Sequence, residues 1–296
     1  MIDSGAMFGP NDRTLHVPAG GEHHRGPWYR SLLRETVSLF KERFGVPASH
    51  DVLLLTGSGT LANQAALYTF GSGWSVRQPE LEFGGRLKRF LQTEGLYKPE
   101  SSNTAWVLYD TDTSHLNEAP ASSHGLQMAD CVSAFPYYSP PASADVWTTV
   151  SSKQLGALPV LGIVVVSPRA WEHARFLTNS DHYSYLNLLR WRNAQLNDES
   201  PYTPAIPLVE DLRDVLASFD AHNFSSMIDS RRRACERALG GAVVGEGPVV
   251  TVAPGAISDE VATRLDLYRR RGGGHQVFLW SGTDEQYERM LSEIAR

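Results

Sequence analysis

The sequence predicts an α/β fold, in which a large domain with a mostly parallel sheet between two helical layers precedes a smaller α+β domain. Short apolar runs rich in β-branched residues alternate with stretches of helical periodicity through residue 204. After the turn-forming residues 201–204, long helical stretches alternate with short strands. We therefore expect an N-terminal segment and the large domain over residues 1–204 and the small domain over residues 205–296, since a chain of 296 residues can bury two cores.

The individual elements follow from the spacing of apolar residues. Residues 28–44 carry apolar side chains at helical intervals, and Gly45-Val46-Pro47 then ends this helix. The apolar run at residues 51–55 predicts a buried strand, which a glycine-containing turn joins to a helix over residues 61–70. Further helices are expected over residues 85–94 and 184–195, and further strands over residues 105–109, 125–130, 146–150, 162–166, 249–252 and 276–280.

Composition argues against several classes of protein. The net charge of −6 does not suit a general binder of nucleic acid or of anionic membranes, and the clusters Arg231-Arg232-Arg233 and Arg269-Arg270-Arg271 are expected on solvated faces. No segment approaches the roughly 18 apolar residues of a membrane span, and no basic and then apolar leader opens the chain, so we expect a cytoplasmic protein. Cys131 and Cys235 are too few for a disulfide framework, and no metal site is expected.

Lys153 points most directly to chemistry. It is the only charged residue between Trp147 and Val166, so its amine should be desolvated, which lowers its pKa and makes it nucleophilic. Asp130 lies 23 residues earlier and closes an apolar strand. Such a pair suits pyridoxal phosphate (PLP), because the lysine forms a Schiff base with its aldehyde and the aspartate pairs with its protonated pyridine nitrogen. Taken singly, a surface lysine and a helix N-cap are the alternatives.

A phosphate site is the second chemical feature that the sequence indicates. The turn Thr56-Gly57-Ser58-Gly59-Thr60 joins a predicted strand to a predicted helix. Glycines let the backbone approach a phosphate closely, and free amides at a helix N-terminus bind it. Ser58, Gly59 and Thr60 are therefore candidate phosphate ligands. The alternative is an ordinary strand–helix turn with an N-cap.

A series of short motifs, in this order along the chain, resembles class V of the PLP-dependent aminotransferases, the fold type I group with the serine–glyoxylate and alanine–glyoxylate transaminases. The motifs are Gly9-Pro10, His24-Arg25, residues 55–60 with Asn63, residues 82–86, Thr113-Ser114, residues 130–133, Ser152-Lys153 and residues 202–204. The resemblance covers most of the chain. It implies an aminotransferase that acts on a small amine or amino acid, with PLP as cofactor.

The same resemblance implies a role for each site residue. Lys153 would be the catalytic lysine, and Phe83 would stack on the cofactor ring. Thr113 would lie beside the ring oxygen. The phosphate would be anchored by Ser58, Gly59, Thr60, Ser152 and, from the neighbouring subunit, by Thr203. A homodimer with shared active sites is therefore expected.

Departures from the family pattern leave the substrate open. Family members hold the substrate carboxylate with an arginine on a late strand, whereas residues 276–282 contain no arginine. Arg25 is the first candidate to replace it, and Arg269-Arg270-Arg271 is the alternative, although this run before three glycines is expected to close a helix in solvent. The alternative functions are a PLP-dependent lyase, epimerase or decarboxylase on a non-standard amino acid, or a catalytically silent protein with this fold.

Overall fold

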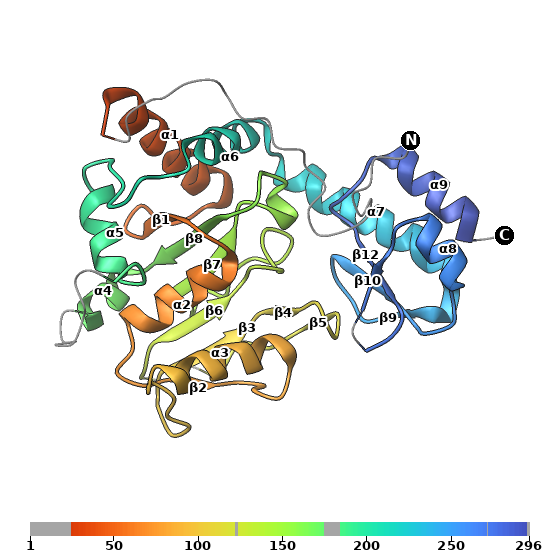
Figure 1. Cartoon of the computed structure of the whole chain (residues 1–296), viewed down its shortest axis with the longest axis horizontal. Coiled ribbons are helices and arrows are strands. Elements are labelled where there is room, and N and C mark those ends of the chain that lie inside the picture. The colour runs from red at the N-terminus through yellow and green to blue at the C-terminus, as the bar shows by residue number, and fades with distance from the viewer. Residues whose placement is uncertain (1–24, 122–123, 175–183, 271, 295–296) are drawn as a thin grey trace.

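The computed structural model describes residues 25–121, 124–174, 184–270 and 272–294. Figure 1 shows a larger sheet surrounded by helices and a smaller sheet close to the C-terminus. The helices are α1 (Pro27–Phe44), α2 (Gly59–Thr69), α3 (Glu82–Thr93), α4 (Pro168–Ala174), α5 (Leu188–Gln195), α6 (Ile206–Ser218), α7 (Ala221–Leu239), α8 (Asp259–Arg264) and α9 (Asp284–Ile294). None of these described helices has the length and apolar character needed to cross a membrane.

The larger sheet has the strand order β1-β8-β7-β6-β3-β2. Its strands are β1 (Asp51–Thr56), β2 (Ser75–Val76), β3 (Thr104–Val107), β6 (Gln127–Asp130), β7 (Val146–Val150) and β8 (Leu161–Val166). β2, β3, β6 and β7 pair in parallel, whereas β8 runs antiparallel between β1 and β7. The predicted, mostly parallel sheet is confirmed. β8 departs from it because residues 151–160, which connect it to β7, are too few for a parallel crossover.

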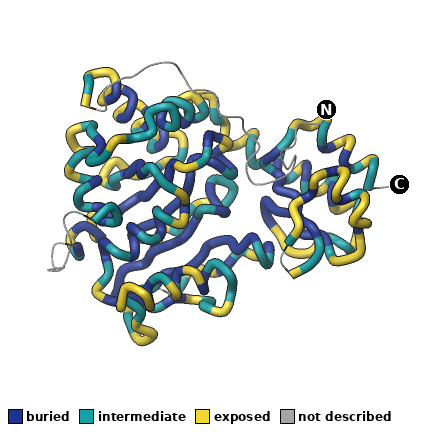
Figure 2. Tube along the Cα trace, viewed as in Figure 1, coloured by how far each residue is buried: buried dark blue, intermediate teal, exposed yellow. Residues whose placement is uncertain are grey.

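Helices cover both faces of this sheet, so the predicted three-layer arrangement is confirmed. Along β1, Val52 and Leu54 belong to one core cluster and Leu53 and Leu55 to the other, because successive side chains of a strand point to opposite faces. The first cluster is closed by α1 and α6, and the second by α2, α3, α4 and α5. Figure 2 shows the strands between these layers as the most deeply buried part of the chain.

Two helix ends show how local sequence positions the later site. α1 ends as predicted, since Gly45 adopts the left-handed conformation, with φ 62°, that glycine tolerates. α3 begins at Glu82, before the predicted start at residue 85, although two glycines follow. Gly84 is needed there because a Cβ atom would lie 2.2 Å from the carbonyl oxygen of Gln78. Phe83 is consequently held on the first turn of a helix.

The smaller sheet is antiparallel and has the order β11-β12-β10-β9. Its strands are β9 (Val243–Val244), β10 (Val249–Val252), β11 (Tyr268–Arg269) and β12 (His275–Phe278). Side chains of α7, α8 and α9 form a third core cluster with these strands. α6 instead contributes Val209, Leu212 and Leu216 to the first cluster, beside α1. A short hairpin, β4 (Tyr109–Asp110) and β5 (His115–Leu116), lies between the two sheets (Figure 1).

The prediction that the arginine clusters lie on solvated faces is wrong for three of their members. The side chain of Arg232 is 12% exposed and donates hydrogen bonds to the carbonyl oxygens of Gly245, Gly247 and Val249. Arg231 is 8% exposed and donates hydrogen bonds to the carbonyl oxygens of Leu279, Ser281 and Gly282. Arg270 follows strand β11, not a helix, and its Nε lies 3.4 Å from Asp112 Oδ1. All three guanidinium groups find acceptors outside the helix or strand that they belong to or follow, which local charge patterning cannot reveal.

Candidate functional site

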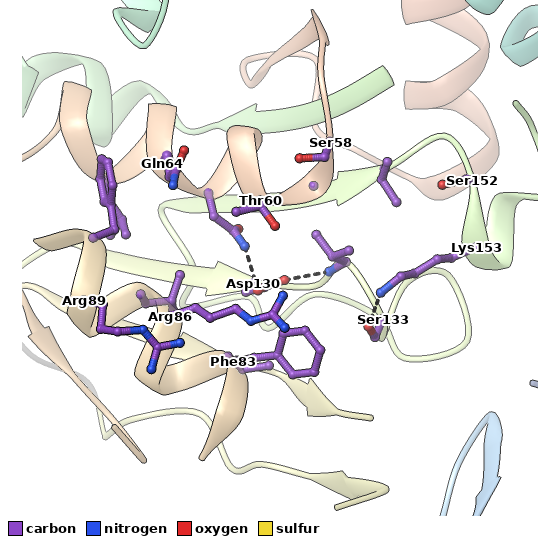
Figure 3. Close-up of a pocket in the computed structure, with 18 of the residues that line it drawn as sticks. Ser58, Thr60, Gln64, Phe83, Arg86, Arg89, Asp130, Ser133, Ser152 and Lys153 are labelled. Carbon is purple, nitrogen blue, oxygen red and sulfur yellow. Dashed lines mark hydrogen bonds between the residues drawn. The ribbon is translucent and has the colours of Figure 1, made fainter. Parts of the chain in front are cut away.

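A cavity of about 640 Å³ opens at the carboxyl ends of β6 and β7, beside the first turns of α2 and α3. Seven of the predicted site residues line it together: Ser58, Gly59, Thr60, Phe83, Asp130, Ser152 and Lys153. Figure 3 shows the side chains of Lys153, Asp130 and Phe83 directed into this one space from three different elements. The carboxyl ends of strands in open α/β sheets are the usual location of ligand sites.

Lys153 lies three residues after the end of β7 and begins the 3-10 turn Lys153–Leu155. Its backbone is left-handed, with φ 55°, an uncommon conformation for a residue other than glycine. Burial lowers the pKa of its amine to about 8; the charge of Asp130 acts in the opposite direction, and that of Arg86 lowers the pKa further. The amine donates a hydrogen bond to Ser133 Oγ at 2.7 Å. It is therefore a nucleophile that can be neutral close to physiological pH.

Asp130 ends β6 and is almost fully buried. Its Oδ2 accepts a hydrogen bond from Asn63 Nδ2 at 2.7 Å, and its Oδ1 accepts one from the Val132 amide at 3.0 Å. Asn63 is held in turn by the hydroxyl of Thr148. Burial raises the pKa of Asp130, while the Val132 amide, Lys153 and Asn63 lower it. A cation in the cavity would favour the ionised carboxylate, and a protonated ring nitrogen is such a cation.

The glycine-containing turn forms the N-terminus of α2, as predicted. Ser58 is the N-cap, and its Oγ accepts a hydrogen bond from the Leu61 amide at 3.3 Å. Gly59 must be glycine, because a Cβ atom there would lie 2.6 Å from a methyl group of Val132. The first amides of a helix have no intrahelical partner, and the helix dipole adds positive potential. The turn can therefore bind a phosphate at one end of the cavity.

Val160 closes the cavity beside this turn. Its carbonyl oxygen accepts a hydrogen bond from the Gly57 amide at 2.9 Å, so the segment after Lys153 is attached to the phosphate turn. Val160 is 49% exposed and has a φ of 75°. A positive φ is strained for a β-branched side chain, and functional sites are where such strain concentrates.

Phe83 forms the wall opposite the phosphate turn. Its ring centroid lies 6.0 Å from Lys153 Nζ and 4.9 Å from Arg86 Cζ. Arg86 also forms an ion pair with Glu82, one turn earlier in α3. An aromatic face directed at the lysine could stack on a planar ring held between Asp130 and the phosphate turn.

Two predicted site residues do not line this cavity. Thr113 lies in the turn between β4 and β5, where its amide donates to Asp110 Oδ1 at 3.1 Å and its hydroxyl is buried without a hydrogen-bond partner in the described part of the chain. Thr203 is exposed and lies outside the cavity of its own chain. Arg25 is also exposed and lines no cavity described here. Roles for these residues stay predictions.

The sequence reasoning missed Ser133, Gln154 and Arg86, and gave Asn63 no role. Asn63 lies one turn after Gly59 on α2, so helical spacing could have indicated that it faces the cavity. Ser133 and Gln154 contact each other across a loop, and no local signal predicts that pairing. Arg86 lies three residues after Phe83, on the same face of α3. This spacing could have predicted from the sequence that Arg86 lies beside Phe83.

A second, smaller cavity of about 100 Å³ lies between α3 and the C-terminal sheet. Phe83 and Arg86 line both cavities, and Arg270 and Gln276 approach from the C-terminal side. The strand expected to carry a carboxylate-binding arginine has none, and Leu279 at its end is fully buried in the third core cluster. Arg270 is thus the cation that the C-terminal strands bring to this second cavity among the described residues.

A scan against models of known protein families finds no match. Among curated proteins, the chain is similar to a pyridoxamine–pyruvate transaminase of Mesorhizobium japonicum, at 27% identity over 56% of this chain and 45% of that protein. It is also similar to a soluble hydrogenase 42 kDa subunit of Anabaena cylindrica, at 30% identity over 62% and 57% of the two chains. An uncharacterized aminotransferase of Methanocaldococcus jannaschii matches at 27% identity over 73% and 64%. The chain spans less than two thirds of the length of each of these relatives.

Solved structures resemble the chain over nearly its whole length. An alanine–glyoxylate aminotransferase of Nostoc superimposes with a TM-score of 0.81 at 18% identity. The superposition covers 100% of this chain and 95% of the aminotransferase. An aspartate aminotransferase of Thermus thermophilus, assigned to subgroup IV, gives a TM-score of 0.77 at 24% identity, over 93% and 94% of the two chains. At these identities the likeness shows that the chain shares their fold.

Proposed function

We propose that this chain is a class V-like aminotransferase of fold type I that uses PLP and acts on a small amine or amino acid. The proposal depends above all on one observation. Lys153, Asp130 and the turn at residues 58–60 meet in a single cavity although they lie on three separate elements. Two of the sequence relatives are transaminases by name, which supports the same reading.

The residues present suit this cofactor on three sides. The turn at the N-terminus of α2, together with Ser152, offers amides and hydroxyls to a phosphate. Among the described residues, the contacts of the Asp130 carboxylate are with uncharged donors, and a pyridinium nitrogen would supply a cation. Phe83 offers a ring face. When bound, PLP would draw electrons away from the α-carbon of the substrate.

In the proposed reaction, Lys153 takes the proton from the substrate α-carbon and would return it to the C4′ carbon of the cofactor. A pKa of about 8 suits this role, because the amine can both accept and donate a proton near neutral pH. Asp130, fixed by Asn63, holds positive charge at the buried end of the cavity. The polar groups of the chain thus keep the proton at Lys153 and the charge at Asp130 apart.

We propose Arg270 as the group that binds the substrate carboxylate. It reaches the second cavity beside Phe83, and its pairing with Asp112 at 3.4 Å leaves donors of its guanidinium available. Arg25, the first candidate from the sequence, lines neither cavity in its own chain. A monocarboxylic amino acid or oxo acid is therefore the proposed substrate class.

The homodimer, the contribution of Thr203 to a neighbouring phosphate site and the cytoplasmic location are proposed on the sequence resemblance. Thr203 is exposed, as a residue that reaches another subunit would be before assembly. The comparisons do not favour the lyase, epimerase or decarboxylase alternative, nor the catalytically silent one. Two of the sequence relatives are a transaminase and an aminotransferase by name.

The test is covalent capture of the lysine. Adding PLP to the protein should produce a visible absorbance band, and reduction with borohydride followed by peptide mapping should place the label on Lys153 rather than on Lys41, Lys88 or Lys98. Lys153→Arg should abolish the band, while Lys98→Arg, an exposed control, should keep it. Absence of the band at saturating PLP, or a label on another lysine, contradicts the proposal. An amino-acid panel then identifies the substrate by bleaching of the band.

A further inference from the structure

The amine of Lys153 has a specific polar contact that the proposed reaction does not use. Within the described part of the chain, Ser133 Oγ is the atom to which the amine donates a hydrogen bond, at 2.7 Å. Ser133 is 6% exposed, so bulk water does not compete for its hydroxyl. Figure 3 shows the lysine side chain extended across the cavity to this serine.

The serine is itself fixed by the residue next to the lysine. Gln154 Nε2 donates to the Ser133 carbonyl oxygen at 2.6 Å, and Gln154 Oε1 accepts from the Tyr137 amide at 3.0 Å. Two consecutive side chains of the 3-10 turn therefore bind the same segment after β6. The left-handed backbone at Lys153 is part of the arrangement that lets both side chains reach the segment.

A hydroxyl suits an amine that changes its protonation state. It accepts a hydrogen bond from an ammonium group, and after rotation it donates one to the lone pair of a neutral amine. Asp130 cannot serve in this way, because an ionised carboxylate accepts hydrogen bonds but has no hydrogen to donate to a neutral amine. Phe83 contributes only a ring face, 6.0 Å away.

We propose that Ser133 is a positioning residue that holds the amine of Lys153 whenever this amine is free. The inference rests on the proposed function, in which Lys153 is released when a substrate amine replaces it and then moves a proton. Ser133 keeps the released amine in the cavity, at a fixed place relative to Asp130, instead of letting it turn into solvent. No bond is formed or broken by Ser133, and the proton stays on the lysine until the substrate exchanges it.

The test measures Lys153 itself, in the protein without cofactor. Competitive labelling with trace acetic anhydride across a pH series, followed by peptide mapping, gives the pKa of Lys153, with Lys98 as the internal reference. Ser133→Ala should lower that pKa by about one pH unit, because the ammonium form loses a charge-assisted hydrogen bond and the neutral amine loses only a weaker one. Ser133→Thr keeps the hydroxyl and should restore the wild-type value. Ser167→Ala, a similarly buried serine at the start of α4, should leave the value unchanged.

An unchanged pKa of Lys153 in Ser133→Ala overturns the inference. If this variant does not fold, Ser133→Cys, which is nearly isosteric and a weak acceptor, should shift the pKa in the same direction, and no shift there is equally decisive. The labelling needs no cofactor, so it is independent of the proposed activity. Failure of that activity shows itself instead as the absence of an absorbance band when PLP is added to the wild-type protein.

Discussion

Replacing Lys153 with methionine should make the cofactor-free protein more stable at pH 7. In the folded chain the pKa of the amine falls from 10.5 to about 8, chiefly because it is buried. At about 1.36 kcal/mol per pKa unit, holding the ammonium form in the folded state costs about 3 kcal/mol. Methionine keeps the length of the side chain without the charge but loses the hydrogen bond to Ser133, worth roughly 1 kcal/mol. A net gain of about 2 kcal/mol in the free energy of unfolding is expected.

The sign of the effect predicts a characteristic pH dependence. Between about pH 8 and pH 10.5 the unfolded chain binds more protons at Lys153 than the folded protein does, so wild-type stability rises with pH across this window. The advantage of Lys153→Met should therefore be complete below pH 8 and disappear by pH 10.5. Urea unfolding at a series of pH values measures this advantage as a change in the urea concentration at the midpoint of unfolding. The slope of the free energy of unfolding against urea concentration should stay constant.

The control for this experiment is Lys98→Met, at an exposed lysine. It should change stability by no more than about 0.5 kcal/mol at any of these pH values. A Lys153→Met variant that is less stable than the wild type at pH 7, with a difference that does not vary up to pH 10.5, would refute the reasoning. It would mean that water reaches the amine and that its charge is not penalised.

Three further predictions concern the cavity and its surroundings. Asp130→Asn should lower turnover by roughly 100-fold or more while PLP still binds, because the charge that balances the ring nitrogen is lost; near-normal turnover would remove Asp130 from that role. Arg270→Ala should raise KM for an amino acid by roughly 10- to 100-fold and leave the spectrum of the PLP-loaded protein unchanged. Arg269→Ala, at the exposed neighbouring position, should leave KM unchanged, and an equal rise in both variants would reject Arg270 as the carboxylate ligand. Val160→Gly should raise the free energy of unfolding by about 1 kcal/mol, since a φ of 75° strains valine but not glycine, and a loss of stability in urea would show that packing of the valine outweighs the strain.

Much of the fold is predictable because its strongest signals are local. The strands over residues 146–150 and 249–252 have the predicted bounds, since both are short β-branched runs bordered by breaking residues. The site could be assembled in outline for the same reason. Asp130 ends a strand, and Lys153 and the turn at residues 58–60 follow strands. The carboxyl ends of these strands lie at one edge of the sheet.

The remainder depends on contacts between distant segments. Arg231 is buried because the carbonyl oxygens of Leu279 and Ser281, 48 and 50 residues later in the chain, accept its hydrogen bonds. The sequence of its own helix does not indicate these acceptors. α6 packs beside α1 rather than with the helices that follow it, because an amphipathic pattern specifies a buried face and not its partner. The direction of β8, in contrast, could have been predicted from the sequence, because the connection after β7 is too short for a parallel crossover.

The antiparallel strand β8 has a consequence for how this protein can diverge. Its first residue, Leu161, pairs with Thr56 at the end of β1, and its Gly162 pairs with Val150 at the end of β7. The two segments that leave these ends carry the phosphate turn and the lysine, so their separation is set by hydrogen bonds between main-chain atoms. Every amino acid except proline supplies both halves of such bonds. Side chains along the three strands can therefore drift until little sequence similarity is left, while the distance between lysine and phosphate turn is inherited unchanged.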